Sequence, residues 1–132
     1  MSVFTPAEIE YFNRQRLGRL ATQGASGDLH VVPARFSYNA ETDTIDVFGG
    51  GMGASKKYRD VGRTGRAAFV VDDVPERGKQ RGVEVRGSAE AMTEGGDVMS
   101  GADPQFIRIT PTYIASWGID SEPFQPVGRA AR

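Results

Sequence analysis

The sequence predicts a mainly β protein, a small antiparallel barrel that is closed or partly open. Six or seven short segments with strand patterning are separated by turn signals, and only two segments carry helix signals. The chain also holds 17 glycines in 132 residues, which favours tight turns and strand bends. A β-sandwich is the alternative, because it uses the same strands and turns.

Length and composition restrict the possible functions. A chain of 132 residues suits one domain spanning 1–132, and a formal net charge of −1 argues against general attraction to nucleic acid or membranes. The chain has no cysteine, which excludes disulfides, thiolate nucleophiles and sulfur metal ligands. The start lacks a signal-peptide pattern and no apolar run has membrane-spanning length, so we expect a cytoplasmic protein.

The first half of the chain predicts a helix followed by a three-stranded meander. The helix begins at Pro6 and ends near Gln15, with Thr5 as N-cap and Glu8 completing a capping box. The strands are assigned to residues 16–22, to residues 29–38 and to a segment beginning near Thr44, with turns at 23–28 and 39–43. In the first strand, Leu17 and Leu20 are assigned to the barrel interior.

The second half predicts a short helix and the remaining strands. The helix runs from Ser55 to about Val61, with Gly62 as its left-handed stop. The strands are assigned to residues 66–72, 81–93, 105–110 and 113–117, the last two being one strand or a pair interrupted by Pro111. The apolar run at 67–71 is typical of a strand buried on both faces. We expect residues 94–103 to form a mobile flap and the tail from Ser121 to be irregular.

The segment from residue 44 to 60 is the strongest candidate for a binding site. A strand leads into a glycine-rich turn containing Gly49 and Gly50, and Ser55 can cap a helix that carries Lys56, Lys57 and Arg59. The start of a helix offers unpaired backbone N–H groups and a positive dipole end, and the lysines add full charges, so this turn suits a phosphate. The simpler alternative is a glycine-rich turn followed by a solvated basic helix.

Three residues of the second strand bear on the same site. Pro33 cannot donate to a strand ladder, so it marks an edge or a bulge against which a flat ligand could lie. Arg35 is close enough along the strand to reach the same anion. His30 is the only histidine, and without a neighbouring carboxylate partner in sequence it indicates neither a metal site nor a catalytic triad. We expect no metal.

Six segments together resemble a known family. They are residues 18–22, 30–36, 55–61, 70–73, 81–87 and 116–120, which cover most of the chain. In order and spacing they are similar to the flavin and deazaflavin oxidoreductases of pyridoxamine-phosphate-oxidase type, which share a split β-barrel. They look most like the actinobacterial subfamily that uses coenzyme F420, a deazaflavin. The tail at 124–132 and His30 differ from the branch that oxidises vitamin B6, which argues against that activity.

The resemblance implies a cofactor site and a homodimer. Arg35, Ser55, Lys56 and Lys57 would bind the phosphate, and the site would lie at the interface of two copies. The residues implied for the cofactor are Val32, Pro33, Ala34, Arg35, Gly49, Gly50, Ser55, Lys56, Lys57, Arg59, Val71, Asp72 and Trp117. Arg59 and Arg63 would suit the polyglutamate tail of F420, which favours this cofactor over FMN.

The resulting hypothesis is a reductase that uses reduced F420. It would transfer a hydride from the deazaflavin C5 to an activated C=C, C=N or quinone-type acceptor, possible acceptors including intermediates of secondary metabolism. Tyr58 and Tyr113 are candidate proton donors, with solvent as an equal alternative, so no catalytic residue is assigned. Two alternatives remain: an FMN-dependent oxidoreductase on the same fold, and a non-catalytic protein that binds F420 or a flavin.

Overall fold

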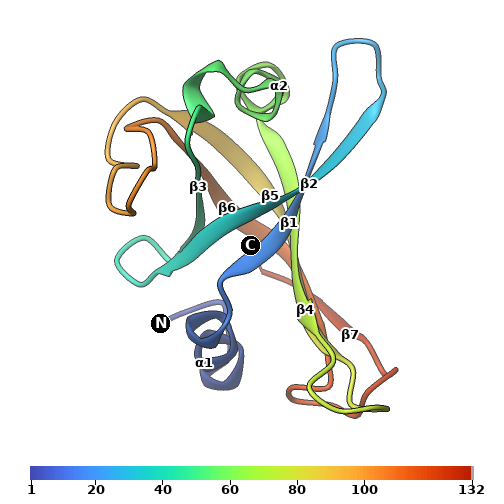
Figure 1. The fold of residues 1–132 in the computed structure, drawn as a ribbon. Helices are drawn as coiled ribbons and strands as arrows, with labels where there is room; N and C mark the ends of the chain where they lie inside the picture. The colour runs from blue at the N-terminus through green and yellow to red at the C-terminus, as the bar shows by residue number, and fades with distance from the viewer. Residues whose placement is uncertain (132) are drawn as a thin grey trace.

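Within residues 1–131, which the computed structural model describes, seven antiparallel strands form a sheet in the order β3-β2-β1-β4-β5-β6-β7. β3 also pairs with β6, so six strands close into a barrel and β7 continues the sheet beyond β6 (Figure 1). This confirms the predicted barrel. The strands are β1 Leu17–Gln23, β2 Leu29–Asn39, β3 Thr44–Phe48, β4 Arg66–Asp73, β5 Arg81–Met92, β6 Phe106–Trp117 and β7 Val127–Ala130.

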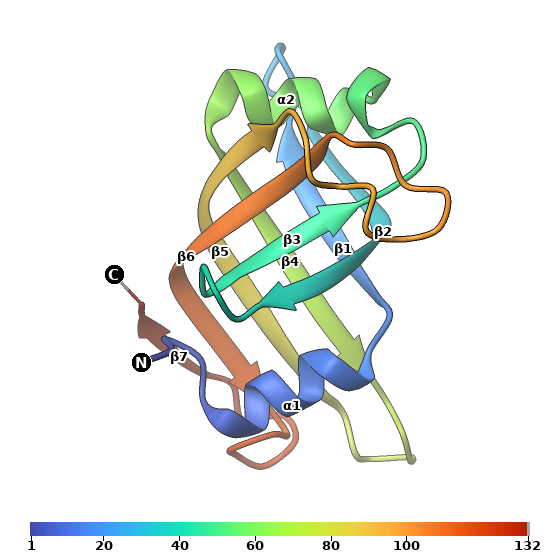
Figure 2. The ribbon, with the colours of Figure 1, turned by 90° about the vertical axis from the view of Figure 1, so that its left-hand side faces the viewer.

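A helix lies at each end of the barrel. α1, Pro6–Arg14, has the predicted capping box: Thr5 accepts from the Glu8 backbone N–H, and Glu8 accepts from the Thr5 N–H at 2.9 Å. α2, Lys56–Thr64, lies at the opposite end and follows a short 3-10 turn, η1, Met52–Ala54 (Figure 2). Neither helix described is long and apolar enough to cross a membrane.

The barrel interior is filled by alternate residues of the strands. In β1 the inward residues are Gly18, Leu20 and Thr22, whereas Leu17 is 48% exposed, so its predicted inward position is wrong. Leu17 and Leu20 are three apart and therefore cannot share one face of a strand. β4 is also buried on alternate residues, with Phe69 and Val71 inside, rather than on both faces as predicted.

Three further boundaries differ from the prediction. α2 continues through Gly62 and ends at Gly65, whose φ of 69° gives the left-handed cap. β6 passes through Pro111 without interruption, although its register against β5 shifts between Arg86 and Gly87. The tail is not irregular throughout, because β7 pairs with β6 over four residues.

Candidate functional site

The edge of β2 is the first element of the site. β2 pairs with β1 from Leu29 to Arg35 but with β3 only from Arg35 to Asn39. Among the described residues, positions 29–34 therefore have no strand on their second side. Pro33 lies in this stretch, which confirms the prediction that it marks an edge, where the missing N–H costs nothing. Backbone groups along this edge remain available to a ligand.

The start of α2 closes one end of that edge. Ser55 is the N-cap, and its hydroxyl accepts from the Tyr58 N–H at 3.3 Å, as predicted for a capped basic helix. A pocket of about 160 Å³ lies beside it, between α2 and the β1–β2 hairpin. We call it the lysine pocket; it is lined by Thr22, His30, Val32, Lys56 and Lys57. The structure thus brings three predicted residues, Val32, Lys56 and Lys57, to one place.

A buried carboxylate, Asp60, contacts two residues that line the lysine pocket, Thr22 and Lys56. Its side chain is 4% exposed and lies 3.7 Å from Lys56 Nζ and 3.6 Å from an Arg63 nitrogen. Thr22 donates to its second oxygen at 3.1 Å. No ion pair within residues 1–131 involves Lys57. Lys57 is therefore the pocket cation with its charge uncompensated by a neighbouring carboxylate.

The glycine-rich turn contributes less to anion binding than its sequence predicts. Asp103, at the end of the loop that joins β5 to β6, accepts from the Gly51 N–H at 3.1 Å and the Gly53 N–H at 3.3 Å. The Asp103 N–H in turn donates to the Gly49 carbonyl at 3.0 Å. Two N–H groups of the turn are thus already satisfied from within the chain. An anion would have to rely on the lysines and the first turn of α2.

The loop of residues 93–105 contacts β2 as well as the glycine-rich turn. Arg35 Nη1 donates to the Ser100 carbonyl at 2.9 Å, and a Cβ on Gly50 would lie 2.9 Å from the Gly101 carbonyl. Arg35 is therefore placed against this loop and does not line the lysine pocket. Gly49 and Gly50 lie beside the same loop. Arg59 turns back along α2, where it donates to the Ala54 carbonyl at 2.8 Å.

The remaining predicted residues lie on or under the outer face of the sheet. Asp72 forms an ion pair with Arg19 at 3.0 Å, and Arg19 lies across the ladder from Pro33. Trp117 packs over Gly82, where a Cβ would lie only 2.5 Å from the indole. Val71 is fully buried in the barrel and Ala34 is 7% exposed, so neither presents its side chain to a ligand. The predicted residues therefore fall into three groups: those at the lysine pocket and the start of α2, those beside the loop of residues 93–105, and those on or under the outer face of the sheet.

Four residues that were not predicted as site residues make contacts that hold this site together: Thr22, Asp60, Ser100 and Asp103. One signal was present in the sequence, because Lys56 and Asp60 have the i,i+4 spacing of a helical ion pair. The contacts of Ser100 and Asp103 join segments about fifty or more residues apart, and no local pattern reports them. Among the described residues, no three His, Asp or Glu side chains gather as a metal site would require.

Comparison with known proteins identifies the family. No family model matches the sequence. A 5a,11a-dehydrotetracycline/5a,11a-dehydrooxytetracycline reductase from Streptomyces rimosus is 43% identical over 122 residues, covering 90% of this chain and 86% of that protein. The chain belongs to the same family. This family is the actinobacterial branch of the pyridoxamine-phosphate-oxidase type, as the sequence motifs indicate.

Solved structures of other proteins share this fold. A heme-binding protein from Mycobacterium smegmatis matches 97% of the chain with a TM-score of 0.70 and 14% identity, and the chain spans 59% of that protein's length. The same fold is found in a Corynebacterium glutamicum protein described as a pyridoxamine 5'-phosphate oxidase. The match has a TM-score of 0.61 and 19% identity, and it covers 86% of this chain and 93% of that one. An FAD-binding protein from Mesorhizobium loti (TM-score 0.62, 20% identity, 86% and 92%) also has this fold. These likenesses confirm the split β-barrel.

Proposed function

We propose that this chain is a cytoplasmic reductase that uses reduced F420 to transfer a hydride to an activated C=C, C=N or quinone-type bond of a small molecule. The observation that carries the proposal is the juxtaposition of the unpaired β2 edge with the lysine pocket. The Streptomyces relative is named as a reductase of tetracycline-type intermediates, which supports the reaction class. An acceptor of that kind, from secondary metabolism, is therefore the first to try.

The residues present fit a phosphorylated cofactor. Lys56 and Lys57 lie in the first turn of α2, where the helix dipole also favours an anion, and Ser55 already fixes the direction of that turn. Beside them, the unpaired edge of β2 around Pro33 offers backbone groups that are not used by β3. Lys56 and Lys57 would hold the phosphate, and the β2 edge would orient the ring.

The chemistry divides between the cofactor and the chain. Reduced F420, when bound, supplies the hydride, because it has carbon where a flavin has N5 and so favours two-electron transfer. The chain binds the phosphate through the lysines and orients the planar ring against the proline-containing edge. Arg35, held by Ser100, adds a fixed positive charge on the outer side of the same strand. No side chain is assigned as the proton donor.

An FMN-dependent oxidoreductase is the second candidate. The same cations would bind the phosphate of FMN, and this chain shares its fold with an FAD-binding protein. Purification from a host that lacks F420 separates the two. Tightly bound FMN would make the protein yellow, whereas an F420 protein would be colourless and would bind added F420.

We propose further that two copies associate through the outer face of the sheet. Leu29, Val31 and Leu17 are 82%, 68% and 48% exposed on or beside β1 and β2. An open pocket of about 620 Å³, lined in part by Leu29, Ala67 and Ala68, lies on the same side. A partner covering this face would bury the apolar side chains. Sedimentation should show a dimer, and Val31→Asp should shift it towards monomer; a monomeric native protein would contradict the proposal.

The cofactor assignment predicts the effect of removing one cation. Lys57→Ala should weaken F420 binding about tenfold to a hundredfold, because a charge-assisted contact contributes roughly 1.5–3 kcal/mol. Arg35→Ala should also weaken binding. The control is Lys79→Ala, in the exposed turn between β4 and β5 at the far end of the barrel (Figure 2). Fluorescence titration measures the affinities, and loss of the reduced F420 signal with a dehydrotetracycline measures turnover.

Two results would reject the assignment. If Lys57→Ala and Arg35→Ala both bind F420 as tightly as the native chain, the site lies elsewhere. If F420 binds but no conjugated acceptor oxidises it, the chain is a binding protein rather than a reductase.

A further inference from the structure

Two carboxylates lie close to side chains that line the lysine pocket. Lys56, Lys57 and Arg63 bring three positive charges to it or to the side chains that line it. Asp60 and Asp28 bring two negative charges. With His30 neutral, these groups leave a single net positive charge.

Asp28 lies close enough to Lys56 to influence an anion bound in the lysine pocket. A Cβ on Gly24 would lie 2.6 Å from Asp28 Oδ1 and 3.1 Å from Lys56 Nζ, so the carboxylate and the ammonium group flank the same point. Asp28 Oδ2 lies 2.8 Å from Nε2 of His30, a lining residue, so the prediction that His30 has no carboxylate neighbour is wrong.

Asp28 also remains ionised at neutral pH. The Ser26 hydroxyl donates to its Oδ1 at 2.6 Å, and this hydrogen bond lowers the pKa of the carboxyl, with the positive charge of Lys56 contributing in the same direction. A permanent negative charge at the pocket rim opposes a second negative charge on a bound phosphate. Asp60, which is buried next to Lys56, opposes it as well.

We propose that the lysine pocket selects a singly charged phosphate, as in a phosphodiester, over a doubly charged phosphomonoester, and that Asp28 sets this preference. The inference rests on the proposed function and deepens it. F420 carries its phosphate as a diester and FMN carries a monoester. Asp28 would therefore favour the deazaflavin through phosphate charge alone, independently of the ring system.

The test uses the full-length chain and two simple anions. Bound F420 is displaced at pH 8 by inorganic phosphate, which is mostly a dianion, and by dimethyl phosphate, a monoanion, at one fixed ionic strength. Asp28→Asn removes the charge and keeps the size of the side chain. It should lower the inhibition constant of dimethyl phosphate about threefold and that of phosphate about tenfold, because the Coulomb energy doubles with the ligand charge.

Two further variants locate the effect. Lys57→Met should raise both inhibition constants, and that of phosphate more. Glu76→Gln makes the same change in net charge in the turn between β4 and β5, at the opposite end of the barrel from α2, and should change neither (Figure 1).

The outcomes are distinct. Equal changes for the two anions in Asp28→Asn, no change at all, or the same change in Glu76→Gln would overturn the inference while leaving the F420 assignment standing. An unchanged Lys57→Met would show that the phosphate binds outside the pocket and would also overturn it. Failure of the native chain to bind F420 rejects the proposed function and the inference with it.

Discussion

At the α1 end of the barrel, Tyr11, Asp73 and Arg81 form a polar cluster that links α1 to β4 and β5. Asp73 accepts from the Tyr11 hydroxyl at 2.8 Å and from two Arg81 nitrogens at 2.7 and 3.1 Å. The Arg81 hydrogen bonds lower the pKa of Asp73, whereas burial and the neighbouring Asp73 raise the pKa of Tyr11. The contribution of Asp73 to stability is therefore lost at low pH, and that of Tyr11 is lost at high pH.

The tyrosine gives the first prediction. Because its folded pKa lies above the unfolded value of about 10, Tyr11 contributes stability that is fully present below pH 10 and is lost as the pH rises above it. Urea unfolding should show the native chain more stable than Tyr11→Phe at pH 8, with the difference shrinking by pH 11. A difference that stays constant between these pH values would contradict the prediction.

The carboxylate gives the second prediction. Since the folded pKa of Asp73 is depressed, its contribution is present above the ordinary carboxyl pKa of about 3.9 and is lost as the pH falls through the lower folded value. Asp73→Asn should therefore be less stable than the native chain at pH 6 and approach it by pH 2. Asp97→Asn, on an exposed loop, is the matched control.

Among single residues, those whose effect is local to their own strand or helix turn were predictable from sequence. Pro33 indicated a strand edge because of its missing N–H, and Ser55 indicated a helix start because of its capping chemistry. Asp103 was not predictable, because its role depends on two distant glycine N–H groups that it reaches only in the folded barrel. Arg35 shows the same limit, since its strand position was foreseen but its contact with Ser100 was not.

At the scale of elements, local signals located α1 but not the end of α2. The capping box and Pro6 fixed the start of α1 within its own first turn. For α2 the sequence predicted Gly62 as the left-handed stop, but the helix continues through that residue. The structure selects Gly65, at φ 69°, whose N–H donates to the Val61 carbonyl at 2.8 Å.

This difference predicts opposite effects of one substitution at two glycines. Gly62→Ala should stabilise the chain by up to about 1 kcal/mol, because its Cβ would meet only Ala91 at 3.9 Å and alanine favours a helix interior. Gly65→Ala should destabilise it by about 1 kcal/mol, because φ is 69° and space is not limiting. Urea denaturation measures both changes, and equal signs would refute this account of the cap.

β7 could not be predicted because its pairing is non-local. Its four residues contain glycine and arginine and lack the alternating pattern of a half-buried strand. It forms because β6 offers a free edge, on which Tyr113 pairs with Ala130 and Ser116 with Val127. Strand identity here follows from the neighbour rather than from the segment's own sequence.

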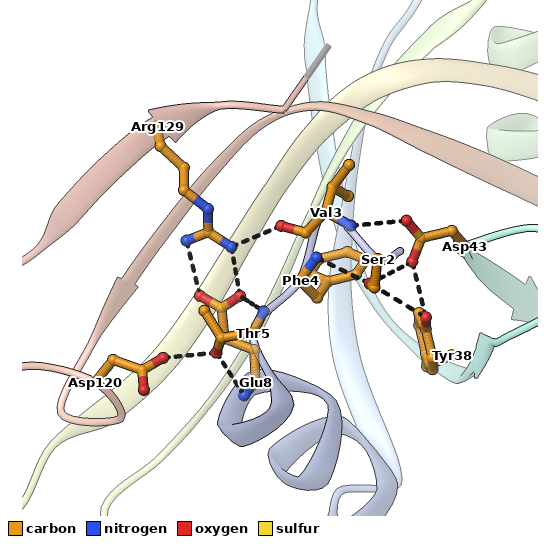
Figure 3. A network of polar contacts seen from close by, with 9 residues as sticks. All are labelled: Ser2, Val3, Phe4, Thr5, Glu8, Tyr38, Asp43, Asp120 and Arg129. Atoms are coloured by element: carbon orange, nitrogen blue, oxygen red, sulfur yellow. Dashed lines mark hydrogen bonds and ion pairs between the residues drawn. The ribbon is translucent and has the colours of Figure 1, made fainter.

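For the whole molecule, the two ends of the described chain are joined by one polar network (Figure 3). Arg129 of β7 binds the fully buried Glu8 of α1 through two contacts, at 2.6 and 3.1 Å, and donates to the Val3 carbonyl at 2.9 Å. Glu8 also completes the capping box. The same carboxylate therefore anchors the helix that covers one barrel end and the strand that ends the sheet.

Breaking this network should destabilise the fold more than a surface change would. Arg129→Met leaves the buried Glu8 carboxylate without its cation. It should lower the free energy of unfolding by about 2–3 kcal/mol, less than for a fully buried ion pair because the Arg129 side chain is itself 35% exposed. Arg77→Met, in the exposed turn before β5, should cost less than about 0.5 kcal/mol. Urea unfolding of both variants measures the difference.

The double variant Arg129→Met with Glu8→Gln tests the cause. If the cost comes from an unpaired buried charge, the neutral amide should recover part of the lost stability, because its oxygen can still accept from the Thr5 N–H. If the double variant is less stable than Arg129→Met, the ion pair is not the source, and the packing of the arginine stem between β7 and α1 is. F420 affinity should be unchanged in either case, since the network and the lysine pocket lie at opposite ends of the barrel (Figure 2).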